Sequence, residues 1–121
     1  MTKSPLYEKV IAELSYFKFR RNSLAYEYLI NAIMMVNEDS YYIKNFSNLY
    51  KDISMRYQTE TSNVKWNITK LIALMYLNTQ EDIIQEYFNL LYYEKPSPKA
   101  FIIYISKKID HDIYQSEMMK V

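Results

Sequence analysis

Apolar residues recur at three- and four-residue spacing along most of this chain, the pattern typical of amphipathic α-helices. The pattern predicts six helices, or seven if a short apolar segment at residues 41–46 is counted. They are expected at residues 5–16, 24–36, 49–57, 61–77, 79–92 and 98–109. We therefore expect one compact all-α domain over residues 1–121, with a frayed or loosely packed tail after residue 109.

Capping residues mark where these helices begin. Ser4-Pro5 and Ser97-Pro98 each place a hydroxyl cap before a proline at the first helical position. The other expected caps are Asn22 or Ser23 for the helix at 24–36, Thr59 or Thr61 for the one at 61–77, and Thr79 for the one that follows. These signals, together with the absence of glycine turns, favour helices over strands even in the strongly apolar stretch 101–105.

Residues 49–78, LYKDISMRYQTETSNVKWNITKLIALMYLN, have the pattern of a helix-turn-helix. Ile53 and Tyr57 form the expected inner face of its first helix, and Ser54 is the small residue where the second helix crosses. The turn at 58–60 lacks the glycine often found there. On the second helix, 100° steps predict a buried stripe of Val64, Ile68, Leu71, Ile72 and Met75.

The opposite face of that second helix is polar and has the chemistry of a duplex reader. It presents Ser62, Asn63, Trp66, Thr69, Lys70 and Ala73, with Lys65 at its margin. Asn63 can pair with adenine, Lys70 or Lys65 can reach guanine or phosphate, and Ser62 and Thr69 are short donors for phosphates. Trp66 has three interpretations: a contact to thymine methyls or sugars, an anchor for a protein partner, or a core residue covered by a neighbouring element.

Composition limits the other functions. Half of the 121 residues are apolar, which is enough for a core, and neither glycine nor cysteine occurs. No cysteine excludes a disulfide or thiolate metal site, and no glycine argues against a phosphate-cradling loop. The longest apolar stretch, residues 71–77, is far shorter than a membrane span. We expect a cytoplasmic protein with no membrane contact and no cofactor.

Formal charge is nearly balanced overall, at +1, but unevenly distributed. Residues 1–24 hold five Lys or Arg and two Glu, whereas residues 79–94 hold four acidic residues and no Lys or Arg. This is either ordinary surface scatter or a basic face opposed to an acidic one. The expected contacts to the phosphate backbone are Lys18, Arg20, Arg21 and Arg56.

Enzymatic function is the least favoured class. The single histidine, His111, lies between Asp110 and Asp112 near the end of the chain, which is typical of a solvated turn. No nucleophile or carboxylate pair lies in a recognisable catalytic motif, and Glu81-Asp82 fits a charge pair at a helix N-terminus.

Three segments resemble the C-terminal DNA-binding effector domain of the sporulation response regulator, the stage 0 sporulation protein A family. They are AYEYLINAIMMV (25–36), LYKDISMRYQTETSNV (49–64) with Ile68 and Ile72 following, and KPSPKAFIIYISKKI (95–109). The resemblance spans about residues 8–110. It implies a six-helix domain whose helix-turn-helix, at about 49–77, recognises a promoter box in double-stranded DNA, often as tandem or paired copies.

The chain departs from that family's pattern in two places. The family carries an N-terminal receiver domain, for which this chain has no room, so we expect no direct switching by phosphorylation. Its recognition helix is rich in arginine, in an Arg-Val-Glu-Arg-x-Ile-Arg-His pattern, where this chain has Asn63 to Lys70 as NVKWNITK. Three lost arginines remove bidentate guanine contacts worth about 1–3 kcal/mol each.

Two functions remain open. The first is a small transcriptional regulator with altered DNA specificity, acting as a homodimer or tandem pair. The second is a protein-binding module, or antagonist, that pairs with another regulator protein through Trp66 and neighbouring tyrosines. Salt discriminates between them, because DNA binding releases counterions and a Trp-centred protein contact does not.

Overall fold

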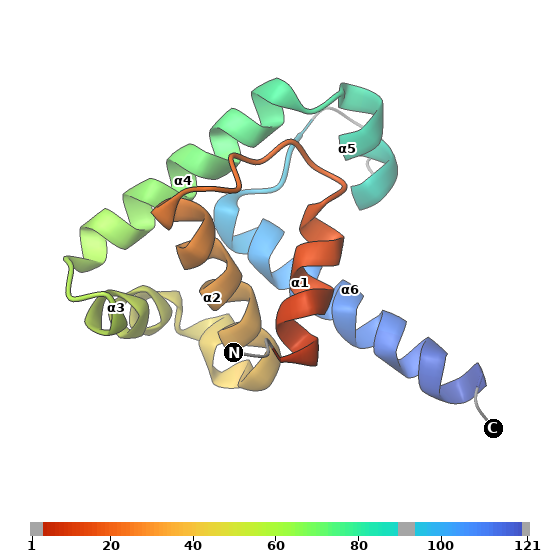
Figure 1. Cartoon of the computed structure of the whole chain (residues 1–121), viewed down its shortest axis with the longest axis horizontal. Helices are drawn as coiled ribbons and strands as arrows, with labels where there is room; N and C mark the ends of the chain where they lie inside the picture. Colours follow the sequence, from red (N-terminus) through yellow and green to blue (C-terminus); the bar gives the residue numbers. More distant parts are fainter. Residues whose placement is uncertain (1–3, 90–93, 120–121) are drawn as a thin grey trace.

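The structure is a computed structural model that describes residues 4–89 and 94–119 (Figure 1). In these ranges it contains six α-helices, one 3₁₀ helix and no strand, which confirms the all-α prediction. The elements are α1 (Pro5–Leu14), α2 (Leu24–Glu38), the 3₁₀ helix η1 (Ser40–Lys44), α3 (Phe46–Arg56), α4 (Thr61–Asn78), α5 (Glu81–Phe88) and α6 (Pro98–Met119).

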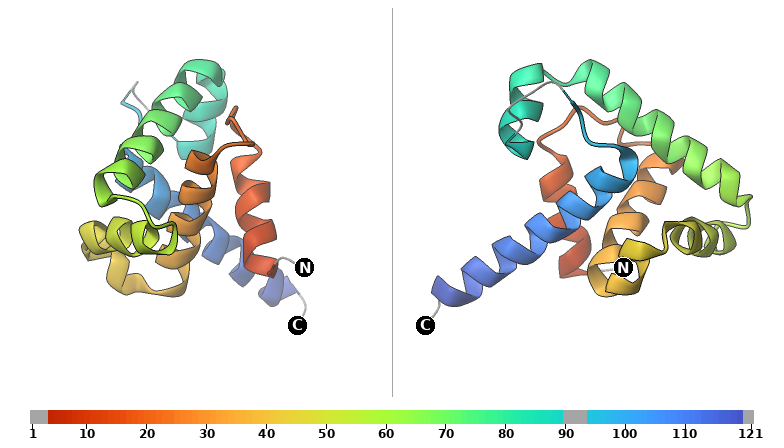
Figure 2. Two further views of the ribbon diagram at one scale, coloured as in Figure 1. Left: turned by 60° about the vertical axis from the view of Figure 1, so that its left-hand side comes forward. Right: turned by 180° about the vertical axis from the view of Figure 1, so that it is seen from behind.

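Helix α2 lies at the centre of the domain and contacts α1, α3, α4, α6 and η1. It can do so because apolar residues cover most of its circumference. Leu29, Ala32 and Ile33 are completely buried, and Tyr28 and Ile30 are nearly so. The turned views show α4 lying obliquely across one end of α2, while the last turns of α6 project beyond the rest of the domain (Figure 2). No helix in the described part of the chain is long and apolar enough to cross a membrane.

The serine caps are confirmed at three helix starts. The side chains of Ser4, Ser23 and Ser97 each accept a hydrogen bond from the backbone N–H three residues further on, at 3.2 Å. Each serine satisfies one of the donors that the first helical turn leaves without an intrahelical partner. The local signal at these three positions is therefore sufficient to place the helix start.

The threonine caps were predicted wrongly. Glu60, not Thr59 or Thr61, precedes α4, and no side-chain hydrogen bond caps that helix. Thr79 ends α4 instead of capping α5, and its Oγ1 accepts the backbone N–H of Lys18 at 2.9 Å. The Thr79 hydroxyl, which was predicted to cap α5, therefore accepts a hydrogen bond from a residue far away in the sequence instead.

Several helix ends also differ from the prediction. Helix α1 ends at Leu14, two residues before its predicted end, and α3 begins at Phe46, three residues before its predicted start. Helix α5 ends at Phe88, before Asn89 in a left-handed conformation, and the predicted continuation to residue 92 reaches outside the described residues. Helix α6 continues to Met119, so the tail expected to fray is helical, although most of its side chains after residue 109 are exposed.

Aromatic rings fill one end of the core, where α5 and α6 meet the α1–α2 connection. Phe101 of α6 is completely buried and lies within 6.4 Å, centroid to centroid, of four other rings. Those rings belong to Phe17, Phe19, Tyr76 and Phe88. This packing holds the α1–α2 connection against the C-terminal half of α4. That connection contains most of the basic residues predicted to contact phosphates.

Candidate DNA-binding surface

Helices α3 and α4 cross at Ser54, as expected for a helix-turn-helix. Ser54 is 4% exposed, and its hydroxyl donates to the carbonyl of Lys51 and lies 3.2 Å from Oγ1 of Thr61 on α4. Ile53 is fully buried beside it. A larger side chain at Ser54 would push the two helices apart. The structure therefore confirms the prediction that Ser54 is the small residue where the two helices cross.

The turn between α3 and α4 is tight and left-handed at Gln58. The backbone N–H of Thr59 donates to the carbonyl of Ser54 at 3.0 Å, which reverses the chain after α3. Gln58 has a φ of 52°, a conformation that places its Cβ in steric conflict with the backbone. The glycine that this turn lacks would adopt the same conformation without strain.

Replacing Gln58 with Gly should therefore stabilise the domain. Relief of the left-handed conformation is worth about 1–2 kcal/mol, and the extra freedom of glycine in the unfolded chain costs about 0.5–1 kcal/mol. We expect a net gain of about 0.5–1 kcal/mol in the free energy of unfolding, measured by urea titration. The control is Gln115→Gly in α6, which should lower the free energy of unfolding because glycine is unfavourable inside a helix. If Gln58→Gly also lowered the free energy of unfolding, the turn at Gln58 would not be strained.

The orientation of α4 agrees with the predicted stripe. Val64, Ile68, Leu71, Ile72 and Met75 are all at most 5% exposed. On the opposite face the side chains of Ser62, Asn63, Lys65, Trp66, Lys70 and Ala73 are exposed, and Thr69 is half-buried. Trp66 is 63% exposed, which overturns the interpretation of this tryptophan as a core residue.

Two asparagines, one turn apart, form an ordered pair at the start of this face. Nδ2 of Asn67 donates to Oδ1 of Asn63 at 2.8 Å, and Nδ2 of Asn63 donates to Oγ1 of Thr59 at 2.9 Å. Asn63 keeps a second amide hydrogen and a second lone pair, which a bidentate contact to adenine requires. Asn67, which sequence reasoning did not assign to the site, thus fixes the side chain of Asn63.

The hydroxyl of Thr69 is less available than the sequence suggests. It donates to the carbonyl of Lys65 one turn back, at 2.8 Å. Its lone pairs remain, so Thr69 can accept a hydrogen bond from a base but cannot donate to a phosphate without breaking that contact.

The C-terminal half of the exposed α4 face is apolar, which sequence reasoning missed. Leu74 is 45% exposed and Leu77 is 79% exposed. The signal was present, because 100° steps place Leu77 within about 20° of Trp66. The exposed face of α4 is therefore polar, with one tryptophan, in its N-terminal half and aliphatic in its C-terminal half.

The expected phosphate contacts lie in two places. Lys18, Arg20 and Arg21 are exposed on the α1–α2 connection, which the bond from Lys18 to Thr79 holds beside the C-terminal end of α4. Arg56 is exposed in the last turn of α3, where one guanidinium nitrogen donates to Oδ1 of Asn31 on α2 at 3.2 Å.

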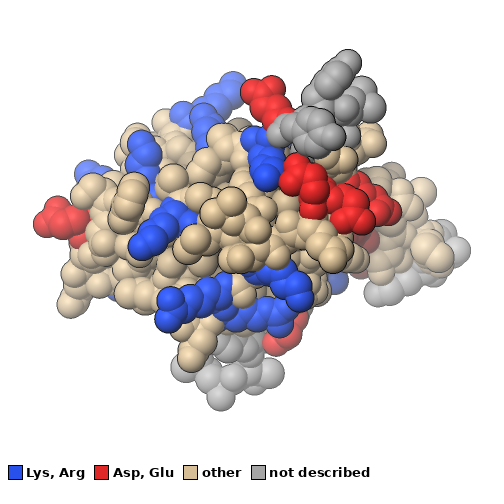
Figure 3. All heavy atoms as spheres, turned by 90° about the horizontal axis from the view of Figure 1, so that it is seen from above, with Lys and Arg blue, Asp and Glu red and all other residues tan. Residues whose placement is uncertain are grey.

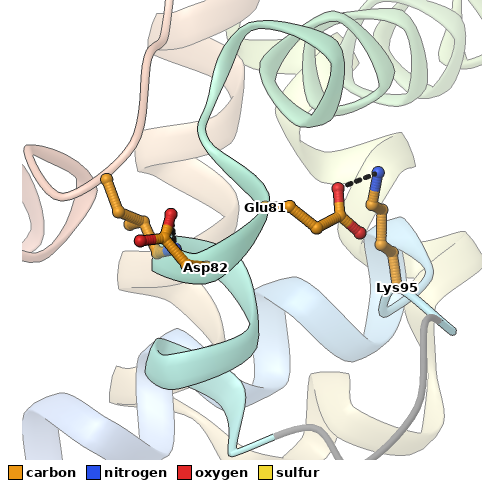
Figure 4. Close-up of polar contacts among 4 residues, drawn as sticks. Glu81, Asp82 and Lys95 are labelled. Carbon is orange, nitrogen blue, oxygen red and sulfur yellow. Dashed lines mark hydrogen bonds and ion pairs between the residues drawn. The ribbon is translucent and has the colours of Figure 1, made fainter.

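Charge on the face that contains α4 is divided. Basic side chains gather over α4 and the α1–α2 connection, and acidic side chains gather towards α5 (Figure 3). At the start of α5, Glu81 pairs with Lys95 at 3.4 Å, and Asp82 points away from that pair, its carboxylate accepting the backbone N–H of Ile83 (Figure 4). Both acids lie in the first helical turn, as predicted.

An open hollow of about 510 Å³ lies between α1, α5 and α6. Glu13 lines it and accepts a hydrogen bond from the Tyr87 hydroxyl. Burial, with a contribution from the nearby carboxyl of Asp112, raises the pKa of Glu13, and burial also raises the pKa of Tyr87. His111 is exposed on α6 and not in a turn, and the described residues contain no cluster of His, Asp or Glu that could hold a metal.

Comparison with protein families identifies the domain. The family described as "Sporulation initiation factor Spo0A C terminal" matches residues 10–109. The chain belongs to this family. The Spo0A C-terminal family consists of helix-turn-helix DNA-binding domains of sporulation transcription regulators, so this protein is a DNA-binding regulatory domain of that kind. The family is not a catalytic one. No curated protein sequence matches the chain.

Proposed function

We propose that α4 enters the major groove of a DNA site and contacts its bases through the exposed face of its N-terminal half. The observation that supports this most strongly is the set of polar side chains that α4 leaves exposed opposite its buried stripe. The proposed contact residues are Ser62, Asn63, Lys65, Trp66, Thr69 and Lys70. In helix-turn-helix domains the N-terminal residues of the second helix make the base contacts.

The recognised site differs from the box expected of the Spo0A family. Val64 and Ile68, which hold α4 on the scaffold, are kept, but the arginines of the family pattern are replaced by Asn63, Trp66 and Thr69. An asparagine pairs with adenine where arginine pairs with guanine. A tryptophan exposed beside it favours thymine methyls. The substitution therefore predicts a preference for A·T base pairs under α4.

Phosphate contacts would come from Lys18, Arg20 and Arg21 beside the C-terminal end of α4 and from Arg56 in the last turn of α3, before α4 begins. So few basic groups give one copy little affinity, and two copies on adjacent half-sites would multiply it. We therefore propose that the domain acts on DNA as a pair.

Removing two of these phosphate contacts should weaken DNA binding without changing its specificity. Each neutralised phosphate contributes about 0.9 to the slope of log affinity against log salt concentration. The double variant Arg20→Ala, Arg21→Ala should reduce that slope by about 1.8 for each bound copy. Fluorescence anisotropy at four salt concentrations, on the preferred site and on a scrambled duplex, measures both effects. An unchanged slope would remove the α1–α2 connection from the interface.

A protein-binding module is the second candidate, and the exposure of Trp66, Leu74 and Leu77 favours it. Large apolar side chains exposed on one helix face are typical of a partner interface. Binding to another regulator through this face would change little with salt, whereas DNA binding weakens steeply. The salt titration above therefore tests both candidates.

A further inference from the structure

The side-chain amide of Asn63 is held in one of its two possible orientations. The oxygen and nitrogen ends of an amide have nearly the same shape, so hydrogen bonds decide which end faces which way. Asn63 has a partner on each side along the helix surface, Asn67 one turn later and Thr59 in the turn before α4. The chemistry of these two partners therefore determines the orientation.

A backbone carbonyl sets the direction of this short chain of hydrogen bonds. Nδ2 of Asn67 donates to the backbone oxygen of Asn63 at 2.7 Å, and that oxygen can only accept. The same Nδ2 also donates to the Asn63 side chain at 2.8 Å, so the atom that it meets there is the acceptor Oδ1. Nδ2 of Asn63 then faces Oγ1 of Thr59, at 2.9 Å.

Asn67 and Thr59 contribute unequally to this orientation. A hydroxyl can both donate and accept, so Thr59 could satisfy either end of the Asn63 amide. The nitrogen of Asn67 can only donate, which excludes the reversed orientation. Thr59 is held in the turn because its backbone N–H donates to the carbonyl of Ser54. Asn67 is therefore the residue that decides which end of the Asn63 amide points along α4 and which points back to the turn.

We propose that Asn67 is a specificity-determining residue that makes Asn63 recognise an A·T base pair in one direction only. In the major groove, adenine presents the N7 acceptor and the N6 donor in an order that is reversed when A·T is exchanged for T·A. An amide of fixed polarity matches one order, whereas an amide that can turn over matches both. Asn67 acts through Asn63 as a positioning residue. This inference rests on the proposed function, because it requires that Asn63 contacts a base.

Binding to three versions of a duplex selected from a random pool tests the proposal. They carry A·T, T·A or G·C at the base pair that Asn63 contacts, which is the position where G·C weakens the native protein but not Asn63→Ala. The native protein should bind the A·T version about tenfold more tightly than the T·A version. Asn67→Ala should bind the A·T and T·A versions within about twofold of each other, and both more tightly than G·C.

Asn67→Asp tests the polarity itself. A carboxylate accepts and cannot donate, so Nδ2 of Asn63 should turn towards residue 67, while the Thr59 hydroxyl donates to Oδ1. The added charge weakens binding to every duplex, but the preference should reverse in favour of T·A. Asn78→Ala removes an exposed asparagine from the last turn of α4 and is the matched control, which should keep the native preference. A native preference in both Asn67 variants, or an equal loss in Asn78→Ala, would overturn the proposal.

Nuclear magnetic resonance of the DNA-free chain separates this inference from the proposed function. The Nδ2 hydrogens of Asn63 should show a nuclear Overhauser effect to the methyl group of Thr59, and this effect should weaken in Asn67→Ala. Its absence in the native chain would overturn the fixed orientation, whether or not the chain binds DNA. If the effect is present but Asn63→Ala binds DNA as the native chain does, base contact by Asn63 is refuted and its fixed orientation stands.

Discussion

Replacing Phe101 with Ala is expected to destabilise the domain by about 3–5 kcal/mol, the largest effect of any single change considered for this protein. The side chain of Phe101 is completely buried, and its ring lies against those of Phe17, Phe19, Tyr76 and Phe88. Removing it would leave a cavity where the α1–α2 connection, α4, α5 and α6 meet. Urea unfolding followed by circular dichroism measures the loss.

Two further variants make this prediction specific. Phe101→Leu retains most of the volume and should cost much less, which keeps a folded protein for comparison. Tyr104→Ala, at a position 36% exposed on the same helix, should also cost less than Phe101→Ala. An equal loss at Tyr104 and Phe101 would mean that the complete burial of Phe101 does not make it the principal packing residue of α6.

The double variant Asn63→Ala, Lys70→Ala is expected to abolish sequence-specific DNA binding. Each side chain is exposed on the proposed contact face, and each good base contact is worth about 1–3 kcal/mol. Together the two losses correspond to about 30-fold to 10⁴-fold in affinity for the preferred site, with a much smaller effect on scrambled DNA. Competition titrations with the preferred and scrambled duplexes give the ratio directly.

The control is a second double variant that removes the same two kinds of side chain, an amide and a lysine, elsewhere on the surface. Gln115→Ala, Lys107→Ala removes one amide and one ammonium group from exposed positions of α6. That variant should bind the preferred site as the native protein does. If both double variants lose affinity equally, only net charge matters and α4 does not recognise bases.

The buried stripe of α4 and the serine caps could be predicted because both depend on local chemistry. A helix with Val64, Ile68, Leu71, Ile72 and Met75 on one side has one orientation that buries them. A serine before a helix satisfies a backbone donor within three residues. The family could be recognised as well, because the spacing between three such segments survives changes in the surface residues.

Features that depend on contacts across the fold could not be predicted. The hydroxyl of Thr79 bonds to Lys18, sixty-one residues away, so its role as a cap was assigned wrongly. The exposure of Trp66 depends on whether a neighbouring element covers this face of α4, and the sequence pattern around Trp66 does not indicate whether one does. Leu77 was overlooked because leucine in an apolar segment is ordinarily counted with the core. The continuation of α6 carries charged and amide residues that resemble a frayed end.

Recognition of DNA bases by α4 is tested by selection from a random duplex pool with the purified chain at about 100 mM salt, a concentration at which unspecific phosphate binding is partly screened. We expect enrichment of one defined, A·T-containing site that the native protein binds and that the variants Asn63→Ala and Lys70→Ala no longer bind. A pool that stays random after repeated rounds, or a site that both variants bind as well as the native chain, would contradict recognition of DNA by α4.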